Sequence, residues 1–158
     1  MEYTRNYNPN FYEEKQRSAN CGSFAFQIKE WYSPDKYFED DCWQTVEEWI
    51  EEGFEFGHDE FDLSETLANI FIDYVLADFE DVRYLWSPDD VRSDEELIAF
   101  RTFVDSDCNW DFHFKVFRDG RWQEKCGGNP VRFCDEWDWH NGILNYISST
   151  FYLARKVA

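Results

Sequence analysis

The sequence predicts an α+β fold in which N-terminal helices pack on an antiparallel sheet. Apolar residues recur at helical spacing up to about residue 80, and alternating β-branched and aromatic segments begin at residue 82. The 158 residues include 21% aromatic side chains, which is enough apolar material for one core. Because no linker or repeat divides the chain, we expect a single domain. Its expected parts are an extended arm at 1–19, a helical part at 20–80 with an acidic stretch at 35–66, and a mainly β part at 82–158.

The arm is rich in Asn and Tyr and has no period, so we expect extended chain held in place by its aromatic side chains. A short helix is expected from Asn20 to about Trp31. It ends at Ser33 and Pro34, because proline disfavours helical geometry in the residue before it.

Two longer helices are expected within and after the acidic stretch. In the first, glutamates point away from an apolar face, which is traced by Cys42, Val46, Trp49, Ile50 and Gly53. In the second, over about 63–79, Asp62 and Glu65 are spaced like a capping box. Its apolar stripe comprises Leu67, Ile70, Phe71, Tyr74 and Val75.

Strands follow from residue 82, where aromatic and β-branched residues alternate between turn residues. Asp119 and Gly120 mark a tight hairpin, because a two-residue turn needs positive φ and glycine adopts it without strain. The expected strands are Val82–Trp86, Leu97–Val104, Phe112–Phe117, Arg121–Lys125 and Thr150–Val157.

The formal net charge of −19 limits the kinds of partner. A strongly negative surface repels phosphate backbones and anionic lipid headgroups, so we expect neither direct nucleic-acid binding nor membrane binding. The stretch 35–66 concentrates this charge, with 13 acidic residues and one basic residue. Such a stretch is either a solvated face that keeps the protein soluble or a surface that docks on a basic partner.

Five cysteines, an odd number at irregular spacing, argue against a secreted disulfide framework. We therefore expect reduced thiols and a cytoplasmic location, and no apolar run approaches the roughly 18 residues that a bilayer span needs. No metal site is expected, because the spacings of Cys108, Cys126, Cys134 and His140 match no short zinc knuckle. No cofactor is expected either, because the chain has no phosphate-binding glycine loop.

Cys21 and His113 are the candidates for chemistry. Cys21 stands at the expected start of the first helix, where free amide groups and the helix dipole stabilise a thiolate. His113 lies on an expected strand, from which its imidazole can project toward that helix end. The alternative is a structural role for both residues, Cys21 as a small buried apolar residue and His113 as a hydrogen-bonded strand residue.

Several short motifs resemble those of small phage-encoded papain-like proteins, similar in layout to the CHAP and cell-wall-amidase branch of cysteine hydrolases. They lie between about residues 20 and 130 and are Asn20-Cys21-Gly22, Ala99-Phe100-Arg101, Asp111-Phe112-His113-Phe114, Asp119-Gly120, Trp122, Lys125, Gly127-Gly128 and Pro130. The resemblance implies a papain-like fold and thiol-dependent hydrolysis or acyl transfer at an amide-like bond through Cys21 and His113. It also implies a phage origin, a location in the host cytoplasm, and an anti-defence role as one use of the fold.

The third catalytic residue stays open. Where the family often has a histidine before the lysine of the returning strand, this chain has Glu124. A carboxylate can also orient an imidazole, so the candidates are Glu124, Asn129 and Asp111. Gln16 precedes Cys21 at an offset similar to that of the papain-like oxyanion glutamine.

A rival hypothesis starts from the acidic stretch. Its carboxylates would mimic a nucleic-acid backbone and block the basic channel of a host or phage-defence nuclease, including a CRISPR effector, without catalysis. The binding residues would be Glu47, Glu48, Glu51, Glu52, Glu55, Asp59 and Glu60. The partner would be a basic defence protein, whereas an enzyme would take an amide substrate; the oligomeric state is left open.

Overall fold

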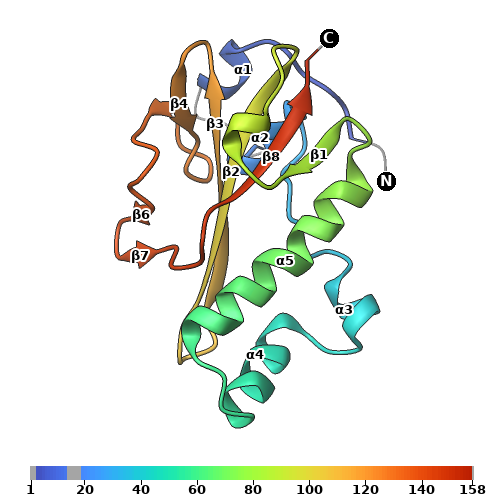
Figure 1. Ribbon diagram of the computed structural model, residues 1–158, viewed down its shortest axis with the longest axis vertical. Helices are drawn as coiled ribbons and strands as arrows, with labels where there is room; N and C mark the ends of the chain where they lie inside the picture. Colours follow the sequence, from blue (N-terminus) through green and yellow to red (C-terminus); the bar gives the residue numbers. More distant parts are fainter. Residues whose placement is uncertain (1–2, 14–18, 158) are drawn as a thin grey trace.

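A six-stranded sheet of order β1-β8-β2-β3-β4-β5 organises the chain, of which the computed structural model describes residues 3–13 and 19–157 (Figure 1). Every pairing in the sheet is antiparallel, and β2 and β3 form the longest pair. The α+β class and the antiparallel sheet are therefore confirmed. The strands of the sheet are β1 (Val82–Leu85), β2 (Glu95–Val104), β3 (Trp110–Arg118), β4 (Arg121–Glu124), β5 (Arg132–Phe133) and β8 (Phe151–Lys156).

The predicted strands are present, with small differences at their ends. The Asp119-Gly120 hairpin is confirmed, with φ values of 55° and 77° at the two turn residues. Three two-residue strands were not predicted, because such short segments show no alternation. They are β5 and the separate pair β6 (His140–Asn141) and β7 (Leu144–Asn145).

The helices are α1 (Asn10–Glu13), α2 (Cys21–Phe26), α3 (Phe38–Cys42), α4 (Val46–Glu55) and α5 (Glu60–Asp78), with a short 3₁₀ turn at Pro88–Asp90. The predicted end of the first helix at Trp31 is wrong, because Gln27 adopts a left-handed conformation that ends α2 five residues earlier. The arm is not extended throughout, since α1 forms one helical turn within it. No helix in the described ranges is both long enough and apolar enough to cross a bilayer.

The helix boundaries around the acidic stretch also differ from expectation. The predicted Asp62–Glu65 capping box is wrong: α5 begins at Glu60, and the side chain of Asp59 accepts the amide of Asp62 as its N-cap. A capping box does occur at α4, between Thr45 and Glu48. Cys42 belongs to α3 rather than to the helix that carries Val46 and Ile50.

Alternation along the central strands sends side chains to two apolar clusters. Phe112, Phe114 and Val116 of β3 join the main core, to which α5 contributes Leu67, Phe71 and Val75. On the opposite face, Ala99 and Phe103 of β2 pack with Trp139 and Tyr146 from the segment around β6 and β7. Figure 1 shows α5 and the β6–β7 segment on opposite sides of β2 and β3. His113 lies on the second face, with its ring centroid 5.4 Å from that of Tyr146 and 6.0 Å from that of Trp139.

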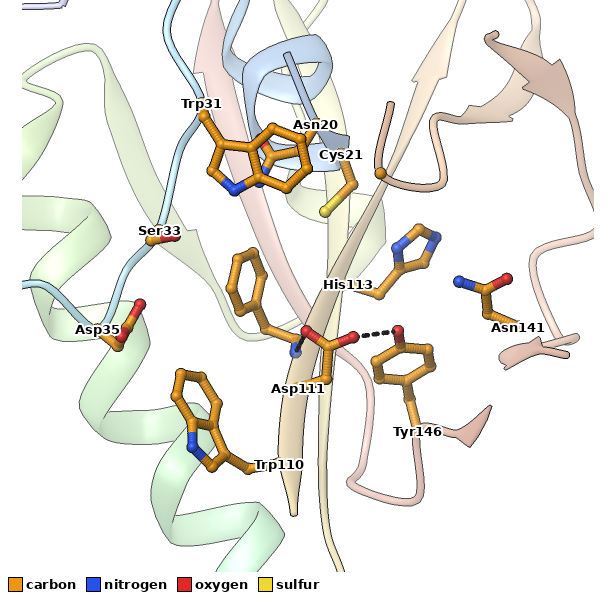
Figure 2. Close-up of a pocket in the computed structure, with 12 residues that line it drawn as sticks. Asn20, Cys21, Trp31, Ser33, Asp35, Trp110, Asp111, His113, Asn141 and Tyr146 are labelled. Carbon is orange, nitrogen blue, oxygen red and sulfur yellow. Dashed lines mark hydrogen bonds between the residues drawn. The ribbon is translucent and has the colours of Figure 1, made fainter. Parts of the chain in front are cut away.

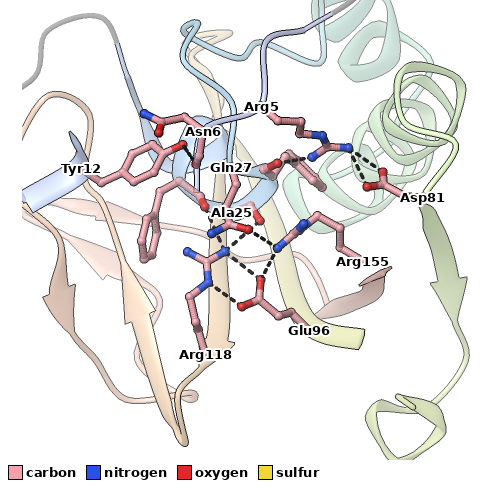
Figure 3. Close-up of polar contacts among 11 residues, drawn as sticks. Arg5, Asn6, Tyr12, Ala25, Gln27, Asp81, Glu96, Arg118 and Arg155 are labelled. Carbon is pink, nitrogen blue, oxygen red and sulfur yellow. Dashed lines mark hydrogen bonds and ion pairs between the residues drawn. The ribbon is translucent and has the colours of Figure 1, made fainter. Parts of the chain in front are cut away.

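Buried polar groups fasten the C-terminal end of α2 to the sheet (Figure 3). Glu96 of β2 accepts hydrogen bonds from Arg118 of β3 at 2.6 Å and from Arg155 of β8 at 2.6 Å. Arg118 also donates to the backbone carbonyls of Phe24 and Ala25. The Phe24 carbonyl has only a long bond of 3.4 Å from the C-cap amide of Gln27, so the arginine adds a donor to the carbonyls at the helix end and fixes the direction of α2.

Candidate functional site

The candidate site lies where β4 separates from β3. The two strands pair only from Lys115 to Arg118 of β3, so the preceding part of β3 lies free of β4. The N-terminal end of α2 faces this free part across a cavity of about 310 Å³ (Figure 2). Cys21, from α2, and His113, from β3, both line the cavity. Two residues that are 92 positions apart in the chain are thus brought to one pocket.

Cys21 is the first residue of α2, and its position is set by the preceding Asn20. The Asn20 side chain accepts the amides of Ser23 and Tyr32 and donates to the carbonyl of Tyr32 at 2.7 Å. Burial raises the pKa of the Cys21 thiol to about 12, and the nearby charge of Asp111 adds to the rise, although the backbone of Phe114 and Gly22 opposes it. The prediction of a stabilised thiolate at the helix start is therefore wrong, because desolvation outweighs the helix end. Cys21 rests as a neutral thiol.

His113 is held by a carboxylate on the neighbouring strand. Its Nε2 lies 2.7 Å from Oε1 of Glu124, and the other oxygen of Glu124 accepts a hydrogen bond from Nε of Arg132 at 2.9 Å. Burial alone would raise the pKa of Glu124, but the hydrogen bond from His113 and the charges of His113, Lys115 and Arg132 lower it. A carboxylate that accepts Nε2–H leaves the lone pair of the neutral ring on Nδ1.

The thiol and the imidazole share the pocket without a hydrogen bond between them. Figure 2 shows the Cys21 sulfur and the His113 ring on adjoining walls of the cavity. Both residues are largely buried, with 5% of Cys21 and 3% of His113 exposed. A reagent or substrate must therefore enter the cavity to reach the sulfur.

The candidates for the third residue occupy different places. Glu124 contacts His113, whereas Asp111 accepts the hydroxyl of Tyr146 at 2.9 Å. Asn129 is exposed, and its backbone carbonyl accepts Nζ of Lys125 at 2.6 Å. Asn129 thus does not line the pocket with Cys21. Gln16 lies outside the described residues.

Several residues near the site were not predicted from the sequence. Tyr146 stacks on His113, and Asn141 lines the same pocket. Both belong to the segment around β6 and β7, whose short strands give no readable pattern. Lys125 is fully buried, and burial lowers its pKa although the thiols of Cys126 and Cys21 lie close enough to oppose this. The sequence could have indicated Lys125, because this charged residue stands at the end of the predicted returning strand.

The seven acidic residues of the rival hypothesis lie outside the pocket, on α4 and at the N-cap and first residue of α5. All of them are exposed. Three have a structural role: Glu47 accepts the indole N–H of Trp110 at 2.9 Å, Glu48 completes the α4 capping box, and Asp59 caps α5. The other four, Glu51, Glu52, Glu55 and Glu60, make no side-chain hydrogen bond or ion pair with the rest of the described chain.

One group of potential metal ligands occurs in residues 3–13 and 19–157. His113, Glu124 and Cys126 offer ligand atoms within 4.8 Å of one another. Both oxygens of Glu124 already accept hydrogen bonds, from His113 and Arg132. An ion here would have to displace those bonds, so the geometry favours the hydrogen-bonded arrangement.

No family model, curated protein or solved structure matches the chain. Its chemistry is therefore argued from the pocket itself. The pocket combines a neutral thiol, an imidazole whose Nδ1 is not engaged by the carboxylate, and a carboxylate that orients the imidazole through Nε2. These groups are suited to nucleophilic attack by sulfur with the imidazole acting as base and then as acid.

Proposed function

We propose that this protein is a papain-like, thiol-dependent hydrolase or acyl-transfer protein that acts on an amide-like bond. One observation carries the proposal: Cys21 at a helix start and His113 on a strand line one cavity, with the far nitrogen of His113 held by Glu124. In this arrangement the near nitrogen is the one left to accept the thiol proton. The resemblance of the motifs around Cys21 and His113 to phage-encoded papain-like proteins supports the same assignment.

The reaction starts from the neutral thiol, because the pKa of Cys21 is raised to about 12. As Sγ of Cys21 forms a bond to the substrate carbonyl carbon, Nδ1 of His113 takes the thiol proton. His113 then gives this proton to the leaving nitrogen, and the carbon–nitrogen bond breaks to leave a thioester on Cys21. Water, or another nucleophile in a transfer reaction, attacks the thioester and restores the thiol.

Glu124 acts as a positioning residue in this scheme. It holds His113 through Nε2, and its negative charge stabilises the imidazolium that forms during the reaction. Arg132 keeps the other oxygen of the carboxylate in place. Tyr146, stacked on the ring, limits rotation of His113 out of the pocket.

Alkylation of the native protein with iodoacetamide at neutral pH tests the proposal. Peptide mapping by mass spectrometry gives the rate at each cysteine, and we expect Cys21 to react fastest because His113 serves as its base. In His113→Ala the rate at Cys21 should fall about tenfold or more, whereas the rate at Cys108 should not change. Glu124→Gln should give an intermediate fall, because the amide can still accept Nε2–H but carries no charge. If Cys21 reacts no faster than the buried Cys126, the assignment of Cys21 as the nucleophile is wrong.

A second candidate function is inhibition of a basic nucleic-acid enzyme by the acidic surface. The observation that favours it is the exposure of large aromatic residues among the carboxylates, with Trp43 92% and Phe56 78% exposed. Glu51→Lys, Glu52→Lys and Glu55→Lys together should abolish binding to a basic defence nuclease, while Cys21→Ala should leave it intact. A nuclease panel that forms no complex at low salt would contradict this function.

A further inference from the structure

The pocket beside Cys21 is lined by acidic side chains that form no ion pair with a described residue. Asp35 and Asp111 line it, and no lysine or arginine does. The carboxylate of Asp111 accepts the Phe112 amide at 2.8 Å and the Tyr146 hydroxyl at 2.9 Å, which are both neutral donors. The carboxylate of Asp35 is hydrogen-bonded only by its own backbone among the described residues, and neither aspartate takes part in an ion pair there. The pocket therefore holds two carboxylates that no lysine or arginine of its lining pairs, and His113 is the one basic side chain among the lining residues.

Nearby cations are committed elsewhere. Lys36 directly follows Asp35, but its Nζ lies 3.3 Å from Asp78 and 4.1 Å from the ring centre of Tyr3. Arg132 pairs with Glu124. Burial raises the pKa of Asp35 and the charge of Glu47 adds to the rise, although a hydrogen bond from its own backbone opposes it, so the ionised form of Asp35 is disfavoured within the protein.

Aromatic rings complete the lining. The indoles of Trp31 and Trp110 and the ring of Phe112 line the pocket. Figure 2 shows Trp31 and Trp110 on opposite sides of the cavity. Trp31 is 47% exposed, so part of its face is open to an incoming group. Trp110 donates its N–H to Glu47, which places a third carboxylate close to the rim. Aromatic faces combined with carboxylates are the surroundings that bind ammonium groups in water.

We propose that the pocket binds a substrate that carries an alkylammonium group close to its amide bond, with Asp35 and Asp111 pairing the charge and Trp31 and Trp110 flanking it. This inference rests on the proposed function, because it names the substrate class for the same site. It has one chemical consequence. The charge of Asp111 opposes a negative sulfur on Cys21, and an ammonium group bound between them offsets that field. The substrate would thus help to activate the thiol that attacks it.

Alkyl methanethiosulfonates test the charge preference directly, because a thiol attacks their sulfenyl sulfur, forms a disulfide and releases methanesulfinate. Three probes are used on the full chain: aminoethyl (cationic), methyl (neutral) and sulfonatoethyl (anionic) methanethiosulfonate. Peptide mapping gives the labelling rate of Cys21 for each probe, and the ratio of the cationic rate to the anionic rate is the readout. The high net negative charge favours cations at every thiol, so variants must separate the pocket from the whole surface.

The pair Asp35→Asn/Asp111→Asn and the pair Glu52→Gln/Glu55→Gln remove the same number of charges. We expect the first pair to lower the cationic-to-anionic ratio at Cys21 about tenfold and the second to change it less than about twofold. Asp35→Asn alone should give about half of the effect on a logarithmic scale and avoids any loss of folding caused by the bond of Asp111 to Tyr146.

The possible failures are distinguishable. If both pairs of variants lower the ratio equally, or neither does, the ammonium pocket is wrong while Cys21 can still be a nucleophile. If no probe labels Cys21 faster than Cys126, and His113→Ala makes no difference, the proposed function fails first. A cationic-to-anionic ratio at Cys21 that depends on Asp35 and Asp111 but not on Glu52 and Glu55 supports both the proposed function and the ammonium pocket.

Discussion

The two ends of helix α2 deal with charge in opposite ways. At its C-terminal end, Glu96 lies between Arg118 and Arg155, and the arginine groups also meet helix carbonyls, so positive and negative groups are matched within the protein. At its N-terminal end, Asp35 and Asp111 face a cavity that no lysine or arginine of the described chain lines. The contacts at the first end fix the position of the helix, and the second end is the one that we propose binds a ligand. A short helix held firmly at one end can present Cys21 accurately at the other.

The largest expected effect comes from breaking the matched end. Glu96→Gln removes the charge shared by two arginines, one of which, Arg155, is fully buried. Two of its nitrogens, Nε and Nη1, already lack a partner among the described residues, and Nη2 donates to Glu96 and Gln27, so Glu96 is the one charged partner of Arg155 there. We expect the free energy of unfolding to fall by about 3 kcal/mol, as urea denaturation would measure.

The matched control for this change is Glu52→Gln on the exposed face of α4. It should alter the free energy of unfolding by less than about 0.5 kcal/mol. Equal stabilities of the two variants would mean that the cluster does not hold α2. Because Glu96 and Arg118 act at the opposite end of α2 from Cys21, the rate at which Cys21 is alkylated reports separately whether α2 has shifted.

A smaller effect is expected from the pH dependence at the pocket end. The pKa of the Cys21 thiol is raised from 9.0 in the reference state to about 12 in the fold. A raised pKa contributes stability that is complete below the unfolded pKa and is lost as the pH rises toward the folded pKa, because the unfolded chain releases the proton first. Between about pH 8 and pH 10, the wild-type protein should therefore lose about 1 kcal/mol more stability than Cys21→Ser, whose hydroxyl does not titrate there.

Urea denaturation of the two proteins at each pH measures this difference, in which the shifts of other groups cancel. If the stabilities of the two proteins changed equally with pH, burial would not raise the pKa of the Cys21 thiol. That result would also allow a resting thiolate, and the proton transfer to His113 would then precede attack rather than accompany it.

Much of the sheet was predictable from the sequence, and the contact between Glu124 and His113 follows from the predicted hairpin. The Asp119-Gly120 turn fixes the register of β3 and β4, so Glu124 pairs with Lys115 and lies on the same face as His113, diagonally across the two strands. That register distinguishes Glu124 from Asn129, which lies beyond the strand in a segment without alternation. The contact of Glu124 with His113 could thus have been derived from the hairpin alone.

Other features depend on tertiary packing that no local pattern reports. α2 ends at Gln27, where the chain pairs with the N-terminal segment through the β-bridge between Arg5 and Ile28. The helix-start argument for Cys21 used only its local position, whereas the pKa of the thiol is decided by burial under β3 and its neighbours. Tyr146 and Asn141 reach the pocket from two-residue strands that have no periodicity.

The smallest expected effect is at Asp35 and contrasts most clearly with that at Glu96. Replacing a carboxylate by an amide should lower the free energy of unfolding at Glu96 but raise it at Asp35. Asp35→Asn removes a charge that burial and Glu47 disfavour and that no described group pairs. A carboxyl group with a raised pKa costs stability once it ionises, so at neutral pH the asparagine should raise the free energy of unfolding by about 0.5 kcal/mol, a modest value because solvent screens the partly open site. Below the pKa of the unfolded carboxyl the gain should vanish, since Asp35 is then neutral in both states. A loss of stability at neutral pH would mean that Asp35 has an internal partner, and only Asp111 would then be left to pair the charge of a substrate.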